Sequence, residues 1–249
     1  MSSFLLPAAA LLAAAAPLLA QAPSPQPRAS LPATAAGEPR LMGGLAFSVG
    51  QPRGAFDRYV GEGYGLAAHG LYRLDARGAL AVRLDAGALN YGRETLRLPL
   101  STRPGGGRVQ LDLTTTNNLF WLGVGPQLMA PRGVVRPYAH GTAGLTYFAT
   151  TSSVRGRGSA AEPLAEDTNY GDTRFAWAGG GGVLVPVYRN ARTLVFADLG
   201  VEYRDSGRDV RYLREGGIRD LPDGGVRLEV IRSRADMLAW HVGVSVGGR

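Results

Sequence analysis

The sequence contains no cysteine and no lysine. The absence of cysteine excludes disulfides, thiol nucleophiles and cysteine-ligated metal sites. All 27 basic residues are therefore arginine, and the formal net charge is +7. The arginines are spread over the expected loops and turns and do not gather on one face, which argues against nucleic acid as a partner. They fit either a codon bias toward arginine or a cationic loop surface that meets anionic lipid head groups.

Long apolar runs are also absent after residue 20, so no segment beyond that point is a candidate transmembrane helix. Residues 4–20 have the apolar character of an export signal, and Ala20-Gln21-Ala22 has the small-x-small form of a cleavage site. We therefore expect a signal peptide over residues 1–22. Residues 23–40 are rich in proline, alanine and serine, which predicts a flexible linker. The folded domain is expected to cover residues 41–249.

Apolar residues recur with period two from residue 41 onward, which predicts strands with two unlike faces. One face carries valine, leucine and aromatic side chains, and the other carries glycine and charged or polar residues. Each apolar face has the length that a tilted strand needs to cross a bilayer. The eight stretches are 43–50, 64–74, 79–91, 119–128, 135–149, 174–187, 194–204 and 237–247. Aromatics on the apolar faces, expected to form interfacial girdles, are Phe47, Tyr72, Tyr147, Trp177, Tyr203 and Trp240.

The alternation has two kinds of irregularity. Leu71 and Phe148 fall on the polar side of their strands. In addition, Leu111 and Leu113 occupy odd positions whereas Phe120 and the apolar residues after it occupy even ones. Because a slip of one residue exchanges the two faces of a strand, we expect a β-bulge near Asn117-Asn118.

The connections between these stretches alternate in length. Short polar turns are expected at 75–78, 130–133 and 189–192. Long connections cover roughly 51–63, 92–118, 151–173 and 205–236, and parts of the last three should continue as strand. Such asymmetry is typical of membrane barrels. The predicted fold is therefore all-β: an eight-stranded antiparallel up-and-down transmembrane β-barrel with short periplasmic turns and long outer loops.

Charged residues on the face opposite the apolar row distinguish this barrel from a soluble one. A lipocalin-like barrel would place large apolar side chains inside and polar ones outside, and a β-sandwich gives no reason for the loop asymmetry. We expect these charges to pair across the barrel lumen, because unpaired buried charges are costly. The predicted lumen charge network is Arg83, Asp85, Arg136, Asp198, Glu202 and Arg204.

The chain resembles the small outer-membrane β-barrel proteins of the OmpA-transmembrane-domain and OmpX type. The resemblance covers about residues 41–249 and rests on the eight strands, Leu-Gly-Val-Gly-Pro at 122–126, Ala-Asp-Leu-Gly-Val-Glu-Tyr-Arg at 197–204 and the last strand, 238–246. It implies a monomer in the bacterial outer membrane, with membrane lipid, lipopolysaccharide and an unknown surface ligand as partners. Such proteins commonly end in an aromatic residue, whereas this chain ends in Gly248-Arg249.

No pattern of catalytic or cofactor-binding residues stands out. His69, His140 and His241 are all expected in the lumen and could bind zinc, but satisfied interior histidines fit better. The residues two positions after them are not serine, so the His-x-Ser motif of lipid A deacylases is absent. We therefore expect no catalytic, cofactor or metal site. The favoured function is a structural or surface-interaction role, with a narrow channel or a lipid-modifying enzyme as alternatives.

The last long connection yields a test. Val226, Leu228 and Val230 alternate, and Asp223-Gly224-Gly225 is a tight-turn signal. Positive and negative charges are nearly balanced between residues 205 and 236, which predicts a hairpin joined by ion pairs instead of a mobile cationic loop. Trypsin added to whole cells should therefore cleave slowly after Arg227 and Arg232. Rapid cleavage at either position would mean that the extension is not an ordered hairpin.

Overall fold

The computed structural model describes residues 39–99, 110–156, 165–190, 192–220 and 226–248. The predicted signal peptide and nearly all of the predicted linker lie outside these ranges. Within the described residues, no helix is long and apolar enough to cross a membrane. The strands are β1 (Leu41–Arg53), β2 (Gly63–Arg73), β3 (Leu80–Pro99), β4 (Gln110–Met129), β5 (Arg136–Gly156), β6 (Ala165–Arg189), β7 (Thr193–Asp205), β8 (Val210–Asp220), β9 (Val226–Ser233) and β10 (Asp236–Gly248). A short 3-10 helix, η3, spans Phe56–Arg58.

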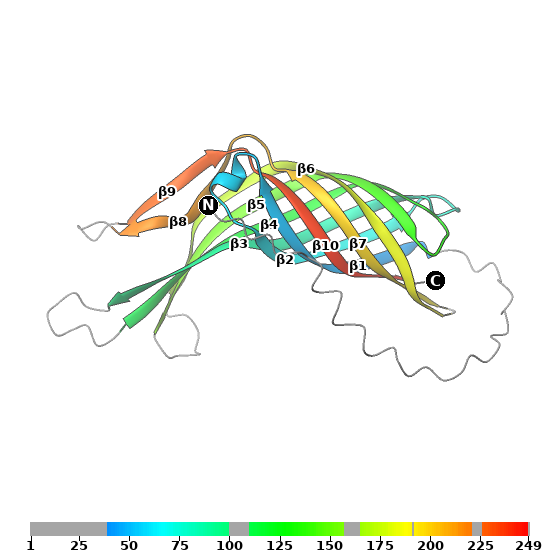
Figure 1. Cartoon of the computed structure of the whole chain (residues 1–249), viewed down its shortest axis with the longest axis horizontal. Helices are drawn as coiled ribbons and strands as arrows, with labels where there is room; N and C mark the ends of the chain where they lie inside the picture. The colour runs from blue at the N-terminus through cyan, green and yellow to red at the C-terminus, as the bar shows by residue number, and fades with distance from the viewer. Residues whose placement is uncertain (1–38, 100–109, 157–164, 191, 221–225, 249) are drawn as a thin grey trace, which may run out of the picture. The chain divides into compact units, whose positions relative to one another are not determined.

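Eight of the described strands form a closed antiparallel barrel in the order β1-β10-β7-β6-β5-β4-β3-β2 (Figure 1). Each strand pairs with its neighbours in the chain, apart from β8 and β9, which form a separate hairpin between β7 and β10. Leu41 closes the ring, because it pairs with Tyr72 of β2 and with Gly248 of β10. The predicted eight-stranded up-and-down barrel is confirmed.

Inward and outward side chains alternate along the barrel strands, as a pleated strand requires. Ser48 and Asp85 are buried inside the barrel, whereas their chain neighbours Phe47 and Leu84 are exposed on its outer surface. The outward side chains form an apolar band around the wall, and we use this name for it below. Its exposed large members include Leu45, Phe47, Tyr64, Leu66, Tyr72, Val82, Leu84, Phe120, Leu122, Val124, Leu128, Leu145, Tyr147, Phe175, Trp177, Leu199, Trp240, Val242, Val244 and Val246.

The predicted bulge lies on a different strand from the one expected. Strand β4 continues through Asn117-Asn118 in unbroken register with β5. The register between β3 and β4 shifts instead between Asn90 and Gly92, so Tyr91 is the extra residue. Tyr91 keeps the inward direction of Leu89, and both are buried; the shift instead brings Gly92 opposite the buried Asn117. The expectation of a bulge in β4 is therefore wrong, although the irregularity is directly opposite the predicted position.

The two ends of the barrel differ, and we call them the turn end and the loop end. At the turn end, short connections join β2 to β3, β4 to β5 and β6 to β7. In the first of these turns, the Leu80 backbone N–H donates to Asp75 Oδ1 at 2.8 Å, and this hydrogen bond lowers the pKa of the Asp75 carboxyl. At the loop end, strands β3 to β6 continue well beyond the last residue pairs of the other barrel strands, as predicted for those connections.

Side chains fill the interior in three layers. A largely aromatic loop-end cluster consists of Phe56, Val60, Leu89, Tyr91, Leu119, Trp121, Phe148, Val210, Tyr212, Ala235, Met237 and Ala239. An apolar turn-end cluster consists of Met42, Leu71, Ala81, Met129, Tyr138, Leu184, Leu194 and Phe196. Between them lies a polar layer of His69, Arg83, Asp85, Gln127, His140, Asp198, Glu202, Arg204, His241 and Ser245. Glycine makes room for these side chains: a Cβ at Gly87 would lie 2.1 Å from the Trp121 ring.

The β8–β9 hairpin continues the β7–β10 ribbon at the loop end (Figure 1). Beyond the pair Asp205–Asp236, the Ser206 N–H donates to the Ala235 carbonyl, and the ribbon bends at Gly207, whose φ of +97° favours glycine. Arg234 bridges the facing carboxylates of Asp205 and Asp236. The predicted hairpin is thus confirmed for the described residues, and the predicted turn at 223–225 lies outside them.

Candidate functional site: the polar layer of the barrel interior

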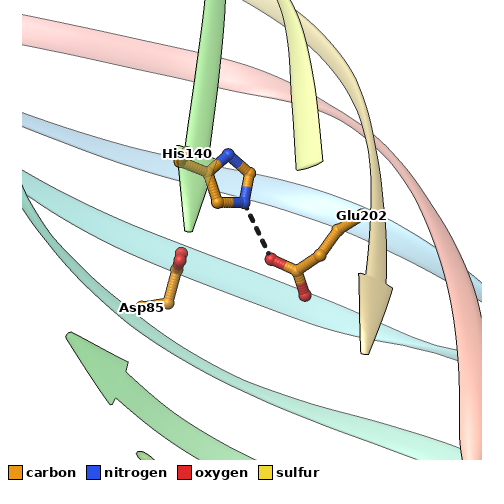
Figure 2. Close-up of side chains that lie close together, drawn as sticks. All are labelled: Asp85, His140 and Glu202. Atoms are coloured by element: carbon orange, nitrogen blue, oxygen red, sulfur yellow. Dashed lines mark hydrogen bonds and ion pairs between the residues drawn. The ribbon is translucent and has the colours of Figure 1, made fainter. Parts of the chain in front are cut away.

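Three ligand-type side chains converge in the middle of the barrel. Asp85 on β3, His140 on β5 and Glu202 on β7 point toward one another (Figure 2), and one donor atom from each lies within 4.8 Å of the others. All three residues are buried. The His140 Nε2 lies 3.0 Å from Glu202 Oε2, and its N–H donates to this carboxylate oxygen. By residue type alone, the group has the composition of a divalent metal site.

The neighbouring arginines give the group a different character. Arg83 Nε and Nη2 donate to the two oxygens of Asp85 at 2.7 Å and 2.8 Å. Arg204 Nη2 donates to Glu202 Oε1. Both carboxylates are therefore already neutralised by a guanidinium, which supplies the positive charge that a bound cation would bring. The arrangement fits a buried ion-pair network better than a metal centre.

Asp198 on β7 organises a second group, with side chains from β2, β5 and β10. Tyr138 Oη donates to Asp198 Oδ1 at 2.8 Å, and Ser245 Oγ donates to Oδ2 at 3.2 Å. Each hydroxyl also lies within 3.0 Å of a histidine Nε2, His241 for Tyr138 and His69 for Ser245. Because a hydroxyl has one hydrogen and gives it to the carboxylate, the two imidazoles must donate from Nε2. This assigns the Nε2-protonated tautomer to both histidines.

The Ser245–His69 pair does not have the arrangement of a hydrolytic site. A nucleophilic serine donates its proton to a histidine, which a carboxylate orients from the far side of the ring. Here the carboxylate of Asp198 accepts from the serine itself, and Ser245 is completely buried. The pair comes from two distant strands, so the sequence could not have suggested it as a local motif. Its geometry is that of a structural hydrogen-bond network.

The six residues of the predicted charge network all lie inside the barrel, but they pair differently from the expectation. Arg83 binds Asp85 and Arg204 binds Glu202, in each case two positions away on the same strand. These ion pairs therefore run along the strands and not across the lumen, which corrects the predicted direction of pairing. The i, i+2 spacing explains the geometry, because both side chains of each pair lie on one face of the strand.

Arg136 and Asp198 lie apart from those two ion pairs. The Arg136 guanidinium packs over the Phe196 ring, 5.0 Å from its centroid, toward the turn end. Asp198 is held by hydroxyl groups and lies 3.8 Å from the Nε2 atoms of His69 and His241. Among the contacts that join strands that are not neighbours, two link β5 to β7. The Tyr138 hydroxyl on β5 donates to Asp198 on β7 at 2.8 Å, and His140 on β5 binds Glu202 on β7.

Sequence reasoning did not single out Tyr138, which belongs to the turn-end cluster and reaches Asp198 of the polar layer. Tyr138 shares the parity of Arg136 and His140 on β5, so its inward direction could have been read from the alternation. Its partner could not, because Asp198 is 60 positions away in the chain. Contacts of this kind depend on how far each strand is staggered along the barrel, which the local pattern does not specify.

Comparison with known proteins gives structural similarity only. No protein-family model matches the sequence, and no curated protein matches it. The structure resembles small outer-membrane β-barrels. Neisserial surface protein A is 14% identical with a TM-score of 0.45, and the alignment covers 85% of this chain and 99% of that one. Ail of Yersinia pestis is 15% identical with a TM-score of 0.40, and the alignment covers 84% of this chain and 97% of Ail. OprG of Pseudomonas aeruginosa is 16% identical with a TM-score of 0.40, and the alignment covers 84% of this chain and 96% of OprG.

A double-mutant cycle tests whether the ion pair on β3 is coupled. Arg83→Met or Asp85→Leu alone leaves one buried charge without its ionic partner, and each should lower the free energy of unfolding by about 3–5 kcal/mol. The double variant should lose less than either single variant, because no uncompensated charge remains. Denaturant unfolding of the folded barrel, followed by gel mobility without boiling, measures the free energy of unfolding of the parent, of each single variant and of the double variant.

The matched control is Arg77→Met, because Arg77 is exposed in the turn between β2 and β3. This variant should change the free energy of unfolding by no more than about 0.5 kcal/mol. If the losses of the two single variants simply add in the double variant, Arg83 and Asp85 are not coupled and the ion-pair interpretation is wrong.

Proposed function

We propose that this chain is an outer-membrane protein with a structural or surface-interaction role, in which a closed barrel anchors a folded outer surface. The observation that carries the proposal is the apolar band on the outside of a barrel whose middle is charged. A soluble barrel has the opposite arrangement. An apolar wall around a polar interior is the arrangement that a lipid environment favours.

Aromatic side chains in the apolar band support a membrane location. Near the loop end, Phe47 stacks on Tyr64, and Phe120 stacks on Tyr147 at a ring-centroid distance of 6.3 Å. Trp177 and Tyr203 form a third pair at the same end. Tyr72 and Tyr188 are exposed at the turn end. Aromatic residues at both edges of an apolar band match the girdles of membrane barrels.

Exposed arginines at the loop end suggest what meets the outer surface. They are Arg53, Arg58, Arg93, Arg208, Arg211 and Arg232. Guanidinium groups bind phosphates with two parallel hydrogen bonds. We propose that this rim contacts the phosphate groups of lipopolysaccharide, while the apolar band contacts membrane lipid and the outer loops carry the contacts to a surface ligand. The alternative of an open channel is disfavoured by the three filled layers of the interior.

A charge placed in the middle of the apolar band tests the membrane location. Val124 is 54% exposed on the outer wall and Val134 is 79% exposed in a short turn. In lipid bilayers, Val124→Arg should lower the free energy of unfolding by about 2–4 kcal/mol, because arginine is costly at the bilayer midplane. Val134→Arg, the matched control, should have an effect near zero. Equal stability of the two variants would mean that the band faces water.

Conductance tests the closed barrel. The full chain, reconstituted into planar bilayers, should give no stable, large single-channel steps, because an eight-stranded interior is just wide enough for the side chains that fill it. A large porin in the same bilayers verifies that the recording detects open pores. Stable large steps from the folded protein would reject the closed barrel and favour the narrow channel.

A further inference from the structure

The loop end of the barrel is closed by two segments from different parts of the chain. The β1–β2 connection, residues 54–62, places Phe56 inside the mouth with 1% of its surface exposed. The β8 strand of the hairpin places Tyr212 against it, and Tyr212 is completely buried. Neither segment belongs to the barrel wall. The seal therefore consists of side chains that the wall strands do not themselves supply.

The Phe56 ring is surrounded by aromatic rings in favourable geometry. Its centroid lies 5.0 Å from that of Tyr212 at an interplanar angle of 88°, and 6.2 Å from that of Phe148 at 90°. The Tyr91 ring, on the inner face of β3, lies 5.9 Å away. Edge-to-face packing of this kind adds to the stabilisation from burial alone. Phe56 therefore occupies a specific aromatic socket.

The hairpin holds this socket closed from the outside. Tyr212 Oη lies 2.7 Å from Ser233 Oγ, which links the two strands of the hairpin beside the ring. At the base, Arg234 holds the facing carboxylates of Asp205 and Asp236 together. The Arg211 backbone N–H donates to Asp172 Oδ2 at 2.8 Å, which attaches β8 to β6. The position of Tyr212 is thus fixed by contacts independent of Phe56.

Each segment begins near a glycine whose backbone has a positive φ, in the left-handed region of conformational space. Gly54, with φ of +62°, follows β1, and Gly207, with φ of +97°, follows β7. Nothing lies within 4 Å of where a Gly54 Cβ would be, so backbone conformation and not space requires glycine there. These two positions are the points at which each segment changes direction relative to the wall.

We propose that the β1–β2 connection and the β8–β9 hairpin form a two-part lid over the loop end, with Phe56 as the stopper and the Tyr212 ring as the latch. The stopper is released only when the latch moves, because Tyr212 packs directly against Phe56. The lid is a property of the barrel mouth and does not depend on the proposed membrane location. Moving it uncovers an aromatic recess, whose floor is Trp121, above the polar layer.

Thiol accessibility tests the lid, since the chain has no cysteine of its own. Val60, on the inner side of the β1–β2 connection, is 5% exposed, and its neighbour Tyr59 is 37% exposed. In the folded full-length protein, a polar maleimide should modify Val60→Cys at least about tenfold more slowly than Tyr59→Cys, because modification of a buried thiol requires local opening. Equal rates would show that the connection is not docked, and would overturn the proposal.

The latch is tested in the Val60→Cys background. Tyr212→Ala should raise the modification rate of the thiol introduced at position 60 at least about tenfold, since opening no longer requires the ring to move. Tyr212→Phe keeps the ring and loses only the contact to Ser233, so it should raise the rate far less than Tyr212→Ala does. An unchanged rate in Tyr212→Ala would overturn the latch, and so would a rate in Tyr212→Phe as high as in Tyr212→Ala.

Folding of each variant is checked by its gel mobility before and after heating. If Tyr212→Ala does not form the barrel, Tyr212→Leu replaces it, because leucine keeps an apolar side chain but removes the edge-to-face contact. The expected result is then the same increase in the rate at which the introduced thiol is modified. A folded Tyr212→Leu variant with the rate of the parent would overturn the proposal.

Discussion

The outward side chains of the apolar band carry no charge, so the charged residues in the same part of the strands lie inside the barrel. An eight-stranded interior is just wide enough to be filled by side chains, and enclosed charges are tolerated only when they are paired. Two enclosed arginine–carboxylate pairs have partners two positions apart in the chain: Arg83–Asp85 and Arg204–Glu202. The same spacing recurs in the more exposed pairs Arg174–Asp172 and Arg234–Asp236. The local backbone itself brings each pair together, so pairing does not depend on the fold of distant segments.

The local pattern is sufficient to predict which residues face inward, because strand geometry has a period of two. It places Arg83, Asp85 and Glu202 in the interior, and the i, i+2 spacing would also have identified their ionic partners. It is not sufficient for the contacts of Asp198, whose partners Tyr138 and Ser245 come from β5 and β10. Those contacts depend on the stagger of the strands around the barrel, a global quantity that no single strand encodes.

The exceptions to the alternation have a physical reason. Leu71 and Phe148 do point inward with the polar residues of their strands, but each lies near an end of the barrel. Leu71 belongs to the turn-end cluster and Phe148 to the loop-end cluster. The inner face therefore has its ion pairs in the middle and apolar clusters toward both ends, with the buried Arg73 and Arg136 among the turn-end residues. Tyr91 follows the same rule, since it continues the inward row of Asp85 and Leu89 and belongs to the loop-end cluster.

The layers are joined to one another by Trp121, and this determines what opening of the mouth can achieve. The Arg204 guanidinium lies 4.8 Å from the Trp121 ring centroid, in cation–π contact, while its Nη2 donates to Glu202. Trp121 thus rests on the ion-pair network below and supports the aromatic cluster above. Displacing Phe56 leaves this floor in place, because Trp121 is held from beneath by Arg204. The mouth therefore opens onto a closed aromatic recess and not onto a continuous pore.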